Sequence, residues 1–205
     1  MTRKRLLAAV AGVAALAATS AFAQAPPTVR LRGVIESVDG NTVLAKSDKG
    51  DALKLNLADK MLVVEVVKAS LADIKDGSFI GSGAMPQPDG TQKAIEVHIF
   101  PESMRGTGEG FRPWDGAPDS TMTNGTVGAT ATVTGIVGPV ITIKYKNGDK
   151  QIIVGPDVPI VRFEIGDMSA VKPGVAFAVV AAVQQPDGSF NINRINVGRD
   201  GVVPR

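Results

Sequence analysis

The chain has 205 residues, with 22 lysines and arginines, 20 aspartates and glutamates, one histidine and no cysteine. The absence of cysteine excludes disulfides, thiolate metal ligands and thiol nucleophiles. Three of the basic residues are Arg3, Lys4 and Arg5, and without them the chain is near neutral, so it lacks the basic surface of a nucleic-acid binder and the polybasic patch that binds anionic lipid.

The first segment predicts a secretory signal peptide over residues 1–23. Its basic head is followed by an uncharged apolar run over residues 6–18, and the small residues Ala21 and Ala23 precede Gln24, which is the pattern of a cleavage site. A retained membrane anchor is the alternative, but the apolar run is shorter than the roughly 20 residues that span a bilayer. We therefore expect a periplasmic or secreted mature protein without a transmembrane span.

The next segment predicts a first set of strands joined by tight turns. Apolar and polar residues alternate, which is the period of a β-strand, and Asp39-Gly40 and Pro88-Asp89-Gly90 mark hairpin turns. A short helix is expected over residues 70–77, with Ser70 and Asp73 as a capping box. The predicted strands are 33–38, 41–46, 52–57, 78–84 and 93–99.

A second copy of this pattern follows from Gly135 to Val197. The turn Gln87-Pro-Asp-Gly90 recurs as Gln185-Pro-Asp-Gly188, 98 positions later, whereas Gly33 would match Gly135 at a spacing of 102. Such ordered matches indicate an internal repeat. The unequal spacing predicts a shorter first hairpin in the second copy.

Each copy has three strands, a short helix and a hairpin, which is the order of an OB-type barrel. We therefore expect an all-β fold with short helices, a tandem pair of small five-stranded OB-like barrels. Residues 28–100 would form the first barrel, 127–200 the second, and 101–126 a loop between the domains. An SH3-like barrel, or a two-sheet sandwich spanning both copies, is the alternative.

The shared motifs carry a resemblance to a known family. The Gly-x-Val/Ile start, the Asp-Gly or Asn-Gly hairpin, the Ser-Leu-x-Asp-Ile-Lys-x-Gly helix and the late Pro-Asp-Gly turn resemble secreted bacterial OB-like repeats that form a domain of unknown function. These motifs are structural. The resemblance therefore implies a fold and no catalytic residues.

The segment between the copies is rich in glycine and proline but also holds the only tryptophan of the chain. It is a candidate binding surface for a ligand or a partner, through stacking on aromatic rings and anion pairing. The alternative is that its aromatic residues pack the segment onto a barrel and set the angle between the domains. The candidate residues are Arg105, Phe111, Arg112, Trp114 and Asp115.

A second candidate site is a weak metal site that would accept copper, built from His98, Glu102, Met104 and Met122. Against it, a single histidine at the end of a strand is more often a rim residue, and its alternation with Val97 and Ile99 points it out of the barrel. No nucleophile elbow accompanies any serine, so we expect no enzyme and no cofactor.

The sequence therefore favours an exported, non-enzymatic binding or accessory module of the cell envelope. Its partner would be an envelope protein, a peptide or a glycan. A periplasmic metal-handling protein linked to metal transport, and a purely structural envelope protein, are the alternatives.

Overall fold

The structure is a computed structural model that describes residues 26–132 and 138–205. The predicted signal peptide, with Ala21, Ala23 and Gln24, lies outside these residues. In the described part, strands join into one sheet path and the helices are single 3-10 turns; none of these helices is long and apolar enough to cross a membrane.

The strands of the first half are β1 (Thr28–Asp39), β2 (Thr42–Ser47), β3 (Ala52–Ala69), β4 (Phe79–Pro86), β5 (Gln92–Ile99) and β6 (Gly110–Pro113). Those of the second half are β7 (Thr121–Thr132), β8 (Pro139–Tyr145), β9 (Gly148–Ile153), β10 (Ile160–Ile165), β11 (Ala176–Gln184) and β12 (Phe190–Gly198). The 3-10 turns are η1 (Leu71–Asp73), η2 (Glu102–Met104) and η3 (Met168–Ala170).

The expected capping residues are in place, but the helix is shorter than predicted. The Ser70 N–H donates to Asp73 Oδ2 at 2.8 Å at the start of η1. The helix ends after one turn because Ile74 already has extended backbone angles and Gly77 has φ of +79°. The corresponding turn η3 is capped by Asp167, whose Oδ1 accepts from the Ser169 N–H at 2.8 Å.

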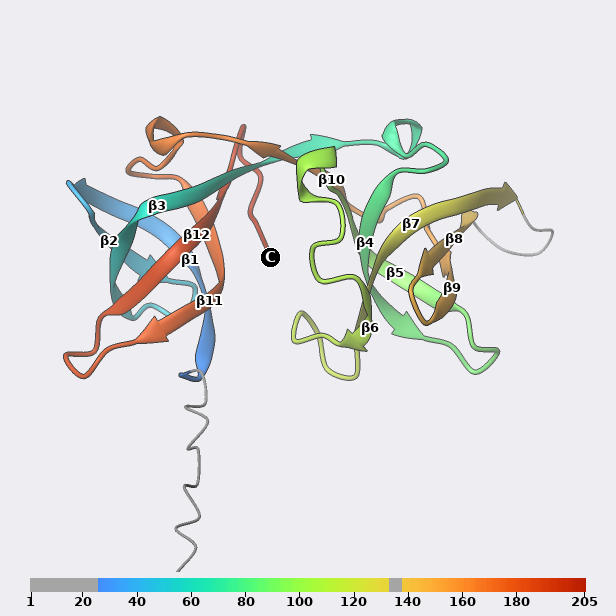
Figure 1. The fold of residues 1–205 in the computed structure, drawn as a ribbon, viewed down its shortest axis with the longest axis horizontal. Helices are drawn as coiled ribbons and strands as arrows, with labels where there is room; N and C mark the ends of the chain where they lie inside the picture. Colours follow the sequence, from blue (N-terminus) through green and yellow to red (C-terminus); the bar gives the residue numbers. More distant parts are fainter. Residues whose placement is uncertain (1–25, 133–137) are drawn as a thin grey trace, which may run out of the picture.

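The predicted all-β fold with a closed five-stranded barrel is confirmed (Figure 1). In barrel I, β1, β2 and β3 form an antiparallel meander, β12 lies parallel to β3, and β11 joins β12 back to β1. In barrel II, β7, β8 and β9 form the meander, β5 lies parallel to β9, and β4 joins β5 back to β7. Both barrels have the strand order of the OB fold.

The barrels do not follow the expected division into residues 28–100 and 127–200. Barrel I takes its meander from the first copy and its hairpin, β11–β12, from the second. Barrel II takes its meander from the second copy and its hairpin, β4–β5, from the first. The cause is β3, which runs for 18 residues and passes straight out of barrel I, so the hairpin that follows is delivered to the other barrel. The two halves of the chain have exchanged their hairpins (Figure 1).

The second copy also begins earlier than the sequence suggested. Gly33 and Gly125 are equivalent, since a Cβ would lie 1.9 Å from Lys46 O at Gly33 and 2.2 Å from Lys144 O at Gly125. A bulge follows each glycine at the same distance, after Ile35 and after Val127. The match of Gly33 with Gly135, which lies outside the described residues, was therefore wrong, and the first hairpin of the second copy is longer rather than shorter. The expected loop 101–126 likewise contains η2, β6 and the first part of β7.

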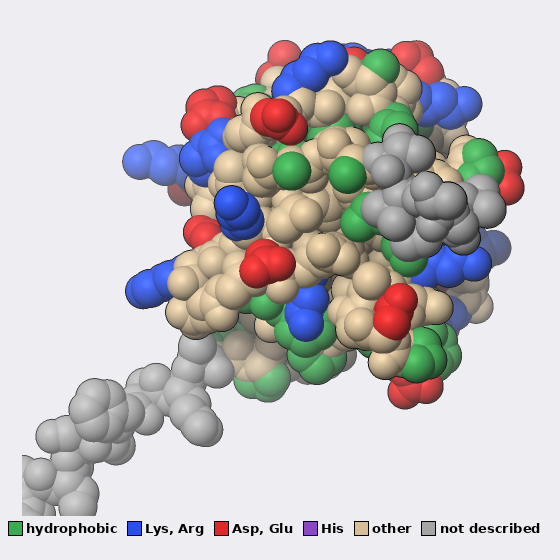
Figure 2. Space-filling view, turned by 90° about the vertical axis from the view of Figure 1, so that its right-hand side faces the viewer, with side chains coloured by type: hydrophobic (Ala, Val, Ile, Leu, Met, Phe, Trp, Pro, Cys, Tyr) green, Lys and Arg blue, Asp and Glu red, His purple; other side chains and the backbone are tan. Residues whose placement is uncertain are grey.

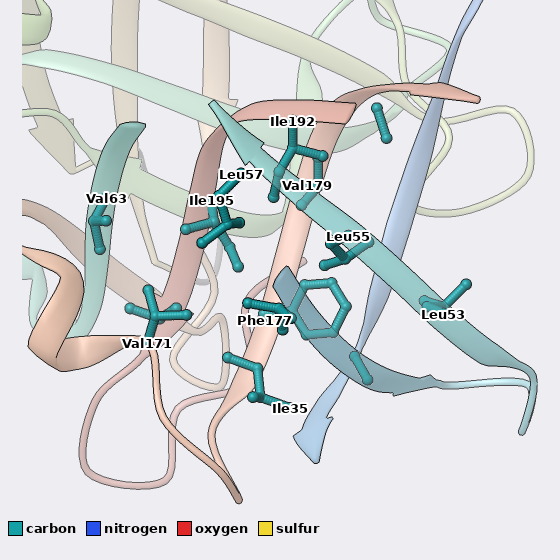
Figure 3. Close-up of a cluster of buried hydrophobic side chains, with 14 residues drawn as sticks. Ile35, Leu53, Leu55, Leu57, Val63, Val171, Phe177, Val179, Ile192 and Ile195 are labelled. Atoms are coloured by element: carbon teal, nitrogen blue, oxygen red, sulfur yellow. The ribbon is translucent and has the colours of Figure 1, made fainter. Parts of the chain in front are cut away.

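Both barrel cores are filled mainly by aliphatic side chains. In barrel I, Ile35, Leu55 and Ile195 point toward Phe177, the one aromatic ring among the fully buried core residues there (Figure 3). In barrel II, Ile80, Ile141 and Ile143 occupy the corresponding interior. Burial of this apolar area is the main stabilising contribution, because the chain has no disulfide.

The two barrels are joined where β3 and β10 cross as an antiparallel pair. Val66 lies opposite Phe163, and both are buried in a third apolar cluster that also contains Val64 and Met104. On the register next to this pair, Glu65 lies opposite Glu164. Like charges in register are unfavourable, and Arg199 offsets this by contacting Glu164 at 2.7 Å and Glu65 at 3.5 Å.

The exchange of hairpins makes β3 and β12 neighbours, so we expect that an engineered disulfide can join these two strands. Asn56 and Asn191 are neighbours on the parallel pair β3–β12, with Asn56 Nδ2 donating to Asn191 Oδ1 at 3.0 Å. The double variant Asn56→Cys/Asn191→Cys should therefore form a disulfide on oxidation, in a chain with no other thiol. Lys93 is the equivalent of Asn191 in the first copy, so Asn56→Cys/Lys93→Cys is the matched control. Thiol titration should find the control reduced; a disulfide in the control alone would mean that each copy closes on itself.

The Arg199 contacts predict a pH-dependent stability. The Arg162 hydrogen bond, and after it Arg199, hold the pKa of Glu164 below its ordinary value of 4.5. A depressed carboxyl pKa stabilises the fold above the ordinary value, and this stabilisation is lost as the pH falls through the folded value. Arg199→Gln should thus lower the stability slightly at pH 7, since the pair is partly exposed, and this deficit should shrink as the pH falls below the ordinary value of 4.5.

Urea denaturation of both proteins between pH 3 and pH 7 would measure this difference. Arg32→Gln is the control, because Arg32 forms no ion pair among the described residues. A deficit of Arg199→Gln that is constant over the whole pH range would contradict the assignment.

Candidate functional site

The principal candidate site is a cavity of about 220 Å³ between the two barrels, here called the inter-barrel cavity. The connection that carries β6 and the C-terminal segment both run between the barrels at this place (Figure 1). Each barrel and both segments contribute to the lining. The lining residues are Arg30, His98, Phe100, Thr107, Gly108, Arg112, Trp114, Met122, Asn124, Phe163, Val180, Arg194, Asn196 and Arg205.

Four other hollows among the described residues have no aromatic side chain in their linings, although two of them carry charged side chains. A larger hollow of about 440 Å³ lies over barrel I, beside Asn56 and Asn191, but no charged side chain lines it. On the side of the molecule drawn in Figure 2, acidic and basic side chains are interspersed rather than gathered. The inter-barrel cavity is therefore the best place to look for a function.

The strand period directs residues of β5 and β12 toward this cavity. Val97 and Ile99 point into barrel II, and Ile195 and Val197 point into barrel I. Their neighbours must point outward, because successive side chains alternate across a strand. These neighbours are equivalent in the two copies: Glu96 and His98 on β5, Arg194 and Asn196 on β12.

His98 lies outside the core of barrel II, as its alternation predicted, but it is not a surface residue. It is only 7% exposed, and its Nε2 is hydrogen-bonded to the Glu96 carboxylate. Its ring packs on Phe163, with centroids 5.1 Å apart. Glu96 Oε2 also forms an ion pair with Arg205 Nε at 3.4 Å, so Arg205 helps to close this side of the cavity.

Two of the four arginines at the cavity have carboxylate partners and two have none among the described residues. Arg30 pairs with Asp115 at 3.1 Å, and Arg205 pairs with Glu96. Arg112 Nη1 donates only to the Gly108 carbonyl at 2.6 Å. Arg194 Nε donates to Asn196 Oδ1 at 3.1 Å.

The unpaired arginines are also partly removed from water. Burial lowers the pKa of Arg194, and burial followed by repulsion from Arg30 lowers the pKa of Arg112. Both directions mean that the charged form is less well solvated than in water. The cavity therefore has an excess of positive charge that its own side chains do not offset.

Trp114 anchors the connection to barrel II. Its ring is 8% exposed and lies between Gly83 of β4 and Gly116, where an added Cβ would come 2.3 Å from the ring in each case. The backbone N–H of Trp114 donates to the Ser120 carbonyl at 2.9 Å. The packing alternative proposed for this segment thus describes Trp114 well, although one part of the ring also lines the cavity.

The other candidate residues of the connection divide between the cavity and the surface. Arg112 lines the cavity, and Asp115 holds Arg30 at its edge. Arg105 instead pairs with Glu102 at 2.7 Å and donates to the Gly77 carbonyl at 2.9 Å, which fixes the connection on barrel II. Phe111 is 42% exposed, and the centroid of its ring lies 4.7 Å from Lys150 Nζ.

The four candidate metal ligands are used in different ways. His98 and Met122 line the inter-barrel cavity. Glu102 is paired with Arg105, and Met104 is packed in the apolar cluster at the β3–β10 crossing. Over residues 26–132 and 138–205, no three histidine, aspartate or glutamate side chains form a group suited to a metal ion.

Sequence reasoning missed Arg30, Arg194, Asn196 and Arg205. The outward positions of the strand around residues 190–197 offered a signal for Arg194 and Asn196, since they are the equivalents of Glu96 and His98. No local pattern marks Arg30 or Arg205, which reach the cavity through the long-range placement of β1 and of the segment after β12.

Comparison with protein families, characterised proteins and solved structures finds no match to this chain. The resemblance to secreted OB-like repeats of unknown function therefore stays a prediction.

The packing of Trp114 predicts the effect of a single methyl group. Gly83→Ala should displace the indole ring, shift its emission to longer wavelength, increase its quenching by acrylamide and cost about 1–3 kcal/mol of stability. Gly155→Ala is the control, because its Cβ would meet only Val158 at 3.8 Å. An unchanged emission spectrum in Gly83→Ala would show that Trp114 is not packed as described.

Proposed function

We propose that this protein is an exported, non-enzymatic binding module that takes a small ligand in the inter-barrel cavity. The observation that carries the proposal is the lining itself: two arginines without an ion pair stand beside aromatic side chains, in a space shared by both barrels. Cavities at the junction of two domains are common binding sites. Export is supported by the signal-peptide pattern of residues 1–23.

The lining supports binding better than catalysis. It contains no carboxylate and one hydroxyl group, that of Thr107. The imidazole of His98 is the natural general base, and its Nε2 is hydrogen-bonded to Glu96. A general base must lie within hydrogen-bond reach of a nucleophile, and among the described residues no hydrogen bond joins His98 to Thr107.

The size of the cavity limits the ligand. Pockets for drug-sized molecules measure about 300–1,000 Å³, and this one measures about 220 Å³. The ligand is therefore a small molecule, or a single terminus or side chain of a larger partner. This leaves room for the envelope partner that the sequence suggested, provided that it inserts one group.

Filling the cavity should abolish binding. Val180 lies at the cavity and is 37% exposed, so Val180→Phe can occupy the space without entering a barrel core. Val34→Phe is the matched control, because Val34 is 44% exposed on β1 and does not line the cavity. We expect some members of a panel of neutral, acidic and basic fragments to raise the melting temperature of the wild type and of Val34→Phe but not of Val180→Phe. If Val180→Phe responds to the panel as the wild type does, the cavity is not the binding site.

A further inference from the structure

We propose that the ligand of the inter-barrel cavity is a small organic anion, whose acidic group is bound by Arg112 and Arg194 and whose apolar part packs on the aromatic side chains. This inference rests on the proposed function and names the chemical class of its ligand.

Both guanidinium groups have N–H donors without a hydrogen-bond partner among the described residues. Arg112 uses Nη1 for the Gly108 carbonyl, and Arg194 uses Nε for Asn196, while their other nitrogens have no hydrogen-bond partner among the described residues. A guanidinium presents its N–H groups as a planar fork that matches a carboxylate or phosphate. Each arginine therefore retains a pair of donors suited to two oxygens of one acidic group.

The local backbone holds one of these forks in place. Gly108 has φ of +56°, a left-handed conformation that favours glycine, and this conformation turns its carbonyl toward Arg112. A Cβ at this position would also come 3.2 Å from Arg112 Nη2. A side chain here would thus be strained and would crowd the guanidinium.

The arginines come from the two sides of the cavity. Arg112 belongs to β6, which is paired to barrel II, and Arg194 belongs to β12 of barrel I. A partly buried cation without a counter-ion is costly. An anion between the two would offset both charges at once, whereas a cation would add to the repulsion that Arg30 already exerts on Arg112.

The rest of the lining sets the other half of the ligand. Phe163, Trp114, Met122, Phe100 and Val180 present carbon surface to the cavity. A cavity of about 150 Å³ lined by apolar side chains can hold benzene, so about 220 Å³ admits one ring with an acidic substituent. Aromatic or short aliphatic carboxylates and phosphate monoesters fit this description.

Calorimetric titration with defined probes tests the proposal. We expect benzoate or phenyl phosphate to bind the wild type at least tenfold more tightly than neutral benzamide or cationic benzamidine. Arg112→Gln and Arg194→Gln should each weaken binding of the acidic probe tenfold or more. Arg32→Gln is the control, since this arginine of β1 does not line the cavity and should bind the acid as the wild type does.

The outcomes separate this inference from the proposed function. If benzamide or benzamidine binds as tightly as benzoate, and Val180→Phe abolishes this binding, the ligand is not specifically an anion. The cavity would still be a binding site. Unchanged benzoate affinity in both arginine variants would overturn the roles of Arg112 and Arg194. If inorganic phosphate binds as tightly as phenyl phosphate, the aromatic side chains of the cavity do not bind an apolar part of the ligand. If no probe of any charge binds, the inference and the proposed function fail together.

Discussion

The antiparallel crossing of β3 and β10 is the constraint on which the rest of the structure depends. β3 leaves the meander of barrel I and continues past the barrel, β10 follows the last meander strand of barrel II, and the two meet with Val66 opposite Phe163. Because each strand carries the next hairpin away with it, neither barrel can be completed by its own copy. The apolar cluster at the crossing and the Arg199 contacts with Glu65 and Glu164 stabilise this arrangement from both faces of the strand pair.

The inter-barrel cavity is a product of the same exchange. It sets the outward face of β5 near the outward face of β12, although these are equivalent strands of two copies. The two strands differ at these positions, with Glu96 and His98 on one side and Arg194 and Asn196 on the other. The repeat thus supplies two similar walls, and the differences between the copies make the site asymmetric and positively charged. The connection then adds Arg112 and Trp114.

Strand alternation and turn chemistry were enough to predict the all-β class, the five-stranded barrel order and the outward direction of His98. They were not enough to predict which hairpin closes which barrel, because equivalent hairpins offer the same apolar face and the same register to either meander. The start of the second copy was missed for a related reason. Gly125 is identified by the close approach of Lys144 O, which leaves no room for a Cβ, and not by its neighbours in sequence. Trp114 and Arg112 were found from composition alone, whereas Arg30 and Arg205 depend on long-range placement that no local pattern encodes.

The composition of barrel I has a kinetic consequence. It contains both β1 and β12, nearly the two ends of the described chain, so its closure must wait for the last strand to become available. Contacts between residues so distant in sequence are associated with high contact order and slow folding. Until the β11–β12 hairpin arrives, β1 lacks its partner β11 and β3 lacks its partner β12, and such open edges invite pairing with other chains. A polypeptide built in this way benefits from being kept unfolded until the β11–β12 hairpin has been synthesised.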